Sequence, residues 1–423
     1  MATHAGQRIP TPALILLALG PFALGYFFAY LYRAVNAVVA PDLVKDLALS
    51  AKGLGFLTAT YLIAYSAAQL PIGVAFDRFG PRRVQATMLS VAASGALLFS
   101  VARNFETLAV ARALVGAGCA GSLMAGFKAV AMWLPEPRRP LGNACIMAIG
   151  GLGVLTATVP SEAVAAQFGW RGLFLILAAA TIVVAGLIYL LVPEKPQAAA
   201  RPVTFGELAK SLGTIYSDPV FWRVAPMVAS TCGGQIAIQT LWAGPWLRDV
   251  AGMARADVAS ILAWMAIGFM VGALLTGFAA DRLVRRGFSL LALAPGFAVI
   301  FLAAELLVTL NWTGAPGPVW FVFGMFGQAT ILLFPWLATY FGGAAAAGRS
   351  NAALNVFVFG TAFAAQYAIG AVLDLWPKTD AGGYDPQGYQ VAIGLCLAVQ
   401  VLTLLWYFLS MPRETARAAT AIA

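Results

Sequence analysis

The chain has almost no histidine and very little charge. Its one histidine, His4, lies near the N-terminus, so histidine cannot form a catalytic centre, a metal site or a proton relay inside an apolar core. Only 10% of the 423 residues are charged and 61% are hydrophobic, whereas about a quarter of a typical soluble domain is charged. With a mean hydropathy of +0.84, these values exclude an ordinary soluble enzyme and a disordered protein.

Cysteine pairs and nucleotide-binding loops are also missing. The four cysteines (Cys119, Cys145, Cys232 and Cys396) lie in apolar stretches without metal-ligand or disulfide spacing, and we interpret them as small buried hydrophobic residues. No GxxxxGK loop occurs, so ATP-driven pumping would need a partner subunit. We therefore expect no cofactor, no metal site and no copper transport through the methionines. Two other functional classes, a membrane-embedded enzyme and a non-transporting sensor, are the least favoured.

Long apolar runs are what the sequence has in abundance. A helix needs about 20 apolar residues to cross a bilayer. Twelve such spans are predicted, at 13–39, 54–76, 83–102, 107–133, 142–166, 172–192, 220–247, 256–280, 288–310, 318–341, 351–375 and 389–410. The sequence thus predicts an all-α integral membrane protein with two six-helix bundles, 1–192 and 219–423. A polar cytoplasmic linker at 193–218 is expected to join them.

The basic residues of the loops predict the orientation. The first apolar run is too long for a cleavable signal, so we expect it to be retained. With a cytoplasmic N-terminus, the inner loops and tails carry 15 Lys and Arg residues and the outer loops carry 7. This positive-inside bias predicts a multi-pass protein of the inner membrane with both termini cytoplasmic. It also accounts for the net charge of +9 without a nucleic-acid partner.

The two halves contain an internal repeat. A shift of 204 residues lays positions 41–83 on 245–287 without a gap, and ten of the 43 pairs are identical. The identical pairs include Asp77 with Asp281, Arg78 with Arg282 and Arg82 with Arg286. Parallel repeats of six helices are one layout of transporters, with the substrate site between the repeats near the membrane midplane.

The repeated loop resembles a family signature. GVAFDRFGPRR, from Gly73 to Arg83, resembles the loop between the second and third helices of the major facilitator superfamily, and GFAADRLVRRG is similar to its weaker copy in the second half. Arg112 in ARALVGAGCAG resembles that family's fourth-helix pattern. The resemblance implies a secondary transporter that rocks two bundles in alternating access. It also implies gating roles for Gly73, Asp77, Arg78, Arg82, Asp281 and Arg282.

One departure from the family bears on the direction of transport. Exporters of this family often carry a Gly-Pro pair in the fifth helix, and here that helix reads AIGGLGVLTATVPSEAV without such a pair. A drug antiporter is therefore less favoured, although not excluded.

Polar side chains follow the helices that, by the resemblance, line the central path. Tyr26, Tyr30 and Arg33 share one face of the first span, and Tyr61, Tyr65 and Gln69 share one face of the second. The candidate substrate-binding residues are Tyr26, Tyr30, Arg33, Asn36, Tyr61, Tyr65, Gln69 and Arg112 in the first half and Gln235, Gln239, Trp242, Gln328 and Asn355 in the second. The alternative is that they are hydrogen-bonding contacts between helices.

Charges inside the membrane are costly and usually functional. The helical rise of 1.5 Å per residue brings Arg33, Arg112 and Glu162 to similar depth. We expect a cluster with one surplus positive charge, which favours an anionic substrate; a closed Arg–Glu162 pair without substrate contact is the alternative. Glu162 is the candidate proton-coupling residue, and Glu305 and Asp374 are expected to be solvated at helix ends.

The sequence leaves two transport functions open. The first is secondary transport of a small organic anion or similar metabolite, possibly coupled to a proton or another ion, by a chain expected to be monomeric. The second is proton-coupled efflux of amphipathic compounds, in which the tyrosines and Trp242 would form the pocket.

Overall fold

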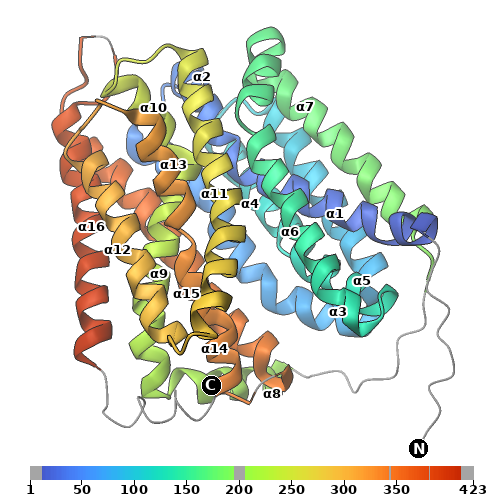
Figure 1. Ribbon diagram of the computed structural model, residues 1–423. Coiled ribbons are helices and arrows are strands. Elements are labelled where there is room, and N and C mark those ends of the chain that lie inside the picture. Colours follow the sequence, from blue (N-terminus) through green and yellow to red (C-terminus); the bar gives the residue numbers. More distant parts are fainter. Residues whose placement is uncertain (1–11, 195–204, 343, 381, 411–423) are drawn as a thin grey trace, which may run out of the picture.

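The computed structural model describes residues 12–194, 205–342, 344–380 and 382–410. These residues fold almost wholly into helices, which form two bundles side by side (Figure 1). The predicted all-helical membrane fold is confirmed.

The first bundle contains the helices of the N-terminal half. They are α1 (Pro12–Ala34), α2 (Asn36–Leu47), α3 (Ala51–Val101), α4 (Phe105–Cys119), α5 (Ser122–Trp133), the short turn η1 (Glu136–Arg138), α6 (Arg139–Thr156) and α7 (Val159–Leu191). The carboxylates Asp42 and Asp46 lie on α2.

Two glycines turn the chain inside this bundle. Helix α3 holds two predicted spans, and Gly80 separates them with a φ of 80°. Gly169 does the same in α7 with a φ of 71°. Because positive φ is strained for residues with a Cβ atom, glycine at these two positions permits a sharp reversal without a long loop.

The second bundle contains the remaining helices. They are α8 (Phe205–Tyr216), α9 (Pro219–Ala237), η2 (Ile238–Trp242), α10 (Ala243–Asp249), α11 (Arg255–Val284), α12 (Leu290–Thr309), α13 (Pro316–Phe326), η3 (Ala329–Leu332), α14 (Leu333–Tyr340), α15 (Ala344–Leu373) and α16 (Pro386–Leu409). Segment η2 is a π-helix, which continues α9 without a break.

Each of the twelve predicted spans falls on helical residues. Within the described ranges, nine helices are long and apolar enough to cross a membrane. The three remaining predicted spans lie on the first part of α3, on α6, which is short, and on α9, η2 and α10 in succession. The arrangement is consistent with twelve crossings, and the bundle boundaries at 193 and 218 remain a prediction.

Part of the predicted polar linker is helical. Its second part folds as α8, which packs against the second bundle. Leu212, Ile215 and Tyr216 follow helical spacing, Ile215 is buried, and the Tyr216 hydroxyl donates a hydrogen bond to Ala353 O at 3.4 Å. The few apolar residues of a polar segment therefore sufficed to dock it as an amphipathic helix.

Cys145 is exposed, contrary to the burial expected for the cysteines.

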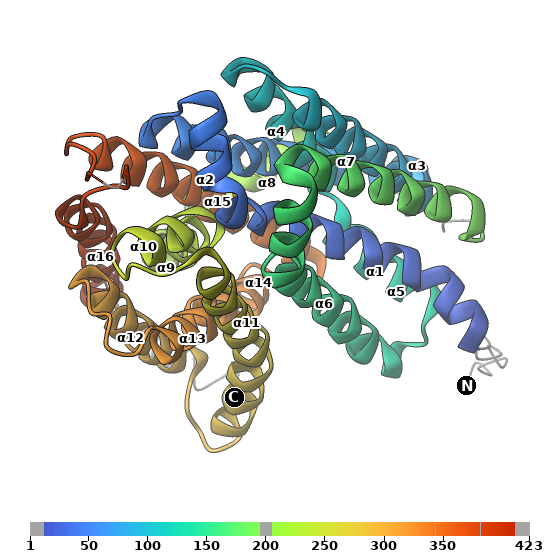
Figure 2. The same cartoon turned by 90° about the horizontal axis from the view of Figure 1, so that it is seen from above.

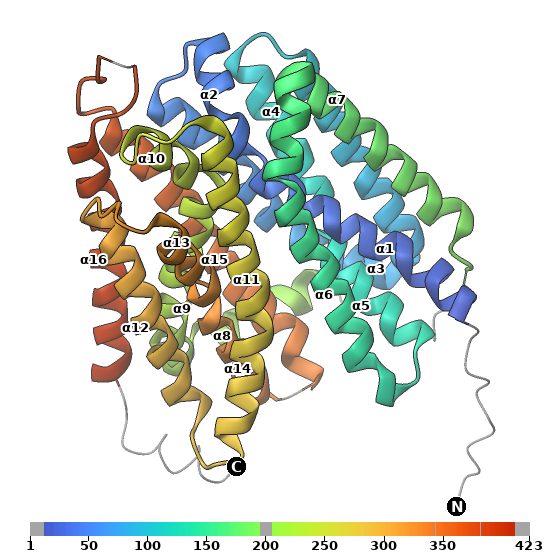
Figure 3. The ribbon, with the colours of Figure 1, turned by 45° about the horizontal axis from the view of Figure 1, so that its top comes forward.

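The bundles meet along α3 and α15 and along α6 and α11 (Figures 2 and 3). At the end of the molecule that carries α2 and α10, backbones approach very closely: a Cβ atom at Gly370 would lie 2.3 Å from Ala51 O. We call this end the outer side, after the predicted orientation, and the opposite end the inner side.

Candidate functional site

A small cavity lies where the two bundles meet. Tyr30 and Arg33 of α1 line one wall, and Gln235, Gln239 and Gln328 line the other. Its volume is about 30 Å³, roughly the space of one water molecule in the liquid. Polar side chains from both halves therefore converge on one enclosed point, as the sequence predicts for five of its candidate residues.

Aromatic rings surround the Arg33 guanidinium. Its carbon Cζ lies 4.7 Å from the ring centre of Tyr30, 5.0 Å from that of Tyr65 and 5.1 Å from that of Phe359. The residue is only 7% exposed, and no carboxylate of the described chain forms an ion pair with it. The rings stabilise the cation through their π faces, but no carboxylate among the described residues neutralises its charge.

Arg112 lies behind this cage. Its NH1 donates to Tyr32 O at 3.0 Å, and its guanidinium covers the Tyr61 ring at 5.0 Å. The Tyr61 and Tyr65 rings stack on each other, with centres 6.0 Å apart. The stacked rings of Tyr61 and Tyr65 thus lie between the guanidiniums of Arg112 and Arg33. Because Tyr61 and Tyr65 are one helical turn apart on α3, their rings lie on the same face of that helix.

Three glutamines form the opposite wall. The Gln328 amide donates to Gln235 Oε1 at 2.6 Å, and the Gln235 amide donates to Gln239 Oε1. The Gln239 amide nitrogen has no hydrogen-bond partner among the described residues, which leaves a donor for the cavity. Gln239 lies on the π-helix η2, a type of irregularity that occurs mostly at functional sites.

The expected cluster of Arg33, Arg112 and Glu162 does not form. Glu162 instead accepts from Arg255 Nε at 2.5 Å, and the same guanidinium binds Asp42 at 2.8 Å. The rise per residue predicts a depth for Glu162 but not the direction of its side chain. In the structure this side chain faces α11 of the other bundle. The ion pair belongs to the outer side, away from the cavity.

A second contact between the bundles reinforces the outer closure. Asp374, directly after α15, accepts from the backbone N–H groups of Ala51 and Lys52, each at 2.9 Å, and so caps the start of α3. Sequence reasoning missed Arg255, Asp42 and Asp374 as a set. Their charges are visible in the sequence, but their partners lie 93 to 323 positions away.

The other predicted site residues have structural partners. The Asn36 amide donates to Thr58 Oγ1 at 3.0 Å, and the Trp242 indole donates to Gln366 O at 3.0 Å. Tyr26 packs edge-on against Tyr30 at 4.9 Å. Gln69 is buried and Asn355 half-buried, and neither lines the cavity. These residues therefore shape the walls rather than the cavity itself.

The predicted gating residues lie on the inner side. Arg82 donates to Tyr189 O at 2.9 Å, while Asp281 pairs with Arg285 of its own helix. The side chain of Asp77 lies outside the described residues. Gly73 has open space where a Cβ atom would be, so close packing does not require glycine there. No contact of Arg282 is recorded in the described residues.

Glu305 is not solvated, contrary to the expectation. It is fully buried on α12, and its Oε1 accepts from the Gln400 amide at 3.3 Å. The sequence placed it near a helix end, but α16 covers that face of α12. Asp374, by contrast, is exposed as expected.

Comparisons with known proteins agree with this architecture. The family model of the Major Facilitator Superfamily matches residues 22–371. A protein of Cupriavidus necator named "Probable sulfoacetate transporter" is 28% identical over 71% of this chain and 72% of its own length. The niacin transporter of Acinetobacter baylyi is 25% identical over 84% of this chain and 77% of its own length. A solved bacterial homologue of the human lysosomal transporter Spinster, inward-facing and unoccupied, superimposes with a TM-score of 0.69 at 18% identity, covering 95% of this chain and 98% of its own.

Proposed function

Because the chain belongs to the major facilitator superfamily and is a secondary transporter rather than an enzyme, we propose that it carries a small organic anion that binds Arg33 between the bundles. The single observation that supports this most is the buried Arg33 guanidinium, which faces a cavity and has no acidic partner. A buried cation without a counter-ion costs free energy, and an anionic solute offsets that cost by entering.

The substrate class follows from the two walls. A carboxylate or sulfonate can accept two parallel hydrogen bonds from the Arg33 fork. Gln239 and its neighbours offer neutral donors and acceptors about a polar group at the other end of the solute. Sulfoacetate and niacin, named for two relatives, are both small anions with a second polar group, and this supports the same class here.

Alternating access assigns roles to the two sides. The Arg255 ion pairs and the Asp374 cap join the bundles on the outer side, and we interpret this state as open toward the inner side. Exposed or half-exposed pairs are worth about 0 to 1 kcal/mol each, so they can break in every cycle. Asp77, Arg78, Arg82, Asp281 and Arg282 are proposed to close the inner side in the opposite state. Both termini are then cytoplasmic, in a bacterial inner membrane.

Glu162 remains the proposed coupling residue, but by way of the outer closure. Protonation of Glu162 would remove one of the two acids that hold Arg255 and so favour opening to the outside. Proton uptake would thereby be linked to the change of state without a carboxylate in the cavity.

The test is a thermal-shift screen of the purified protein against carboxylates, sulfonates, phosphates, amino acids and cationic drugs. Ligands that bind the folded state raise its apparent stability by mass action. We expect small carboxylates or sulfonates to raise Tm, and Arg33→Gln to abolish the shift. Arg103→Gln is the matched control, since exposed Arg103 has the same charge and lies outside the cavity.

The rival function is efflux of amphipathic compounds, which the aromatic rings around Arg33 favour. Cationic drugs would then raise Tm in the wild type and in Arg33→Gln alike, and small anions would not. That outcome would overturn the anion proposal.

A further inference from the structure

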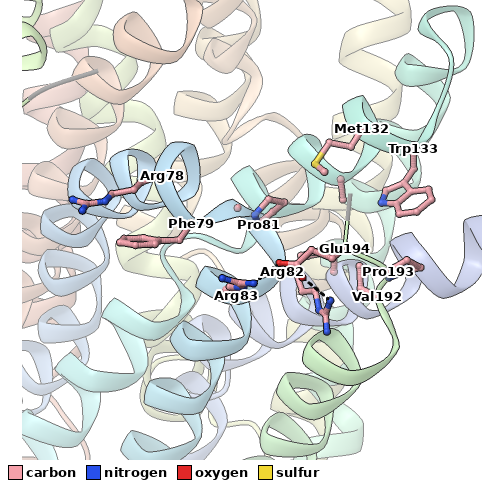
Figure 4. Close-up of a pocket in the computed structure, with 13 residues that line it drawn as sticks. Arg78, Phe79, Pro81, Arg82, Arg83, Met132, Trp133, Val192, Pro193 and Glu194 are labelled. Atoms are coloured by element: carbon pink, nitrogen blue, oxygen red, sulfur yellow. Dashed lines mark ion pairs between the residues drawn. The ribbon is translucent and has the colours of Figure 1, made fainter. Parts of the chain in front are cut away.

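A second, larger cavity lies on the inner side, within the first bundle. Its volume is about 580 Å³. It lies between the Gly80 turn of α3, the end of α5 and the segment after α7 (Figure 4). The central site is elsewhere, so this cavity needs an explanation of its own.

The lining of the cavity is strongly basic. Arg78, Arg82 and Arg83 contribute three guanidiniums, and Glu194 is the one acidic residue of the lining. Glu194 binds Arg83 at 2.7 Å and lies 3.8 Å from Arg82. Arg78 contacts only the ring of Phe79 among the described residues, at 5.1 Å. The described lining thus has more positive charge than Glu194 can neutralise.

The opposite wall of the cavity is apolar. It is formed by Phe22, Met132, Trp133 and Pro193; in Figure 4, Met132 and Trp133 lie across from Arg78 and Phe79, with the Arg82–Glu194 pair between them. A ligand that fills this space must offer both an anionic group and an apolar part.

The mouth of the cavity borders the lipid-facing surface. Arg82 stacks over the ring of Tyr189 at 5.5 Å, and Tyr189 is 55% exposed. The next residues of α7, Leu190 and Leu191, are exposed hydrophobic side chains as well. Aromatic rings beside basic residues are typical of the level of the lipid headgroups.

We propose that this cavity binds the phosphate of an anionic glycerophospholipid from the inner leaflet, with Arg82 and Arg83 as the phosphate ligands and the apolar wall against the upper acyl chain. Arginine suits phosphate because its planar fork donates two hydrogen bonds at once, and basic pockets at this membrane side bind such headgroups. The phosphate competes with Glu194 for the same guanidiniums.

The test uses the full-length protein in dodecyl maltoside and native mass spectrometry to measure the affinity of dioleoylphosphatidylglycerol and of dioleoylphosphatidylcholine. We expect the anionic lipid to bind at least about tenfold more tightly. Arg82→Gln with Arg83→Gln should lower the affinity for the anionic lipid about tenfold or more. This is the loss expected when two basic contacts to the phosphate are removed.

The control removes the same charge from the equivalent loop of the second bundle. Arg285→Gln with Arg286→Gln should change the affinity less than about twofold. Glu194→Gln should raise the affinity several-fold because it removes the competing carboxylate, and a misfolded variant cannot mimic such a gain. Equal binding of both lipids, or equal losses in the two double variants, would overturn the proposal.

A soluble arm separates the lipid from free phosphate. Glycerol 3-phosphate at millimolar concentration should leave Tm unchanged, since it lacks the apolar part; a shift as large as that with the lipid would assign the cavity to a soluble phosphate instead and overturn the lipid proposal. The inference rests on the proposed orientation but not on the proposed substrate, because lipid affinity is measured without transport. Loss of anion binding in Arg33→Gln with normal lipid binding would leave this inference intact.

Discussion

The two bundles share an ancestral pattern at their loops but differ at the cavity between them. The loops at Asp77 and Asp281 keep the same Asp-Arg spacing. Across the cavity, however, the first bundle presents a guanidinium among phenol rings, and the second presents three amides. The repeat has therefore kept the Asp-Arg spacing of the loops, whereas the residues that line the cavity have diverged into one charged wall and one neutral wall.

The largest effect should come from removing the charge of the charged wall. Hydrogen bonds to a charged group are worth about 1.5 to 3 kcal/mol and neutral ones about 0.5 to 1.5 kcal/mol. Arg33→Gln should weaken anion binding roughly 100-fold, and Gln239→Ala no more than about tenfold. Isothermal titration of a ligand found in the thermal-shift screen measures both. Equal losses would show that the two walls do not differ in kind.

The next largest effect concerns one of the closest approaches of the two bundles. Gly370→Ala would place a Cβ atom 2.3 Å from Ala51 O, and such overpacking costs about 1 to 3 kcal/mol. We expect Gly370→Ala to lower Tm in the closed-outside state by several degrees. Gly73→Ala is the control, since nothing lies within 4 Å of a Cβ atom there, and its Tm should not change. A stable Gly370→Ala would mean that the bundles separate more easily than their packing implies.

A smaller effect distinguishes pairs between bundles from pairs within one. Arg255 links α11 to Asp42 and Glu162 of the first bundle, whereas Arg171 pairs with Asp46 inside that bundle. Arg255→Gln removes two ion pairs, each worth about 0 to 1 kcal/mol. We therefore expect it to raise, by up to about tenfold, the rate at which a membrane-impermeant thiol reagent labels Val38→Cys. Arg171→Gln should leave that rate unchanged. Similar rates in the two variants would deny Arg255 its part in the outer closure.

The smallest effect is a pH dependence of the first bundle alone. Hydrogen bonds from Trp170 and Arg171 lower the pKa of the exposed Asp46 carboxyl. A lowered pKa in the folded state stabilises the fold above the unfolded value of about 3.9 and loses that contribution as the pH falls through the folded value. Asp46→Asn should therefore lower the free energy of unfolding at pH 7 by less than about 1 kcal/mol, which appears as a slightly lower Tm. The difference from wild type should vanish near pH 3. A difference that persists there would point to lost packing instead.

The sequence predicted the helices and five of the ten residues that line the cavity for the same reason. Apolar runs and polar stripes are local patterns, so the faces that carry Tyr30 with Arg33 and Tyr61 with Tyr65 could be derived from helical spacing. Gln235, Gln239 and Gln328 were found because amides are rare in apolar spans.

Contacts that depend on the rotation of one helix against another were not predictable. The rise per residue gave the depth of Glu162, but its partner Arg255 belongs to the other bundle. The helix α8 and the burial of Glu305 were missed because both depend on which neighbour covers a short segment. The π-helix η2 has no local signal of which we are aware.

The π-helix has a consequence for how the neutral wall moves. A π turn contains one residue more than the α-helical turn it replaces, and one residue of an α-helix corresponds to about 100° of rotation. The segment Ile238–Trp242 therefore holds a spare residue between α9 and α10. If the π turn shifts along the helix, the Gln239 amide rotates by more than a quarter of a turn about the helix axis while α9 and α10 stay helical. The direction of the Gln239 side chain can thus change through a rearrangement within this one helix, without a movement of either bundle.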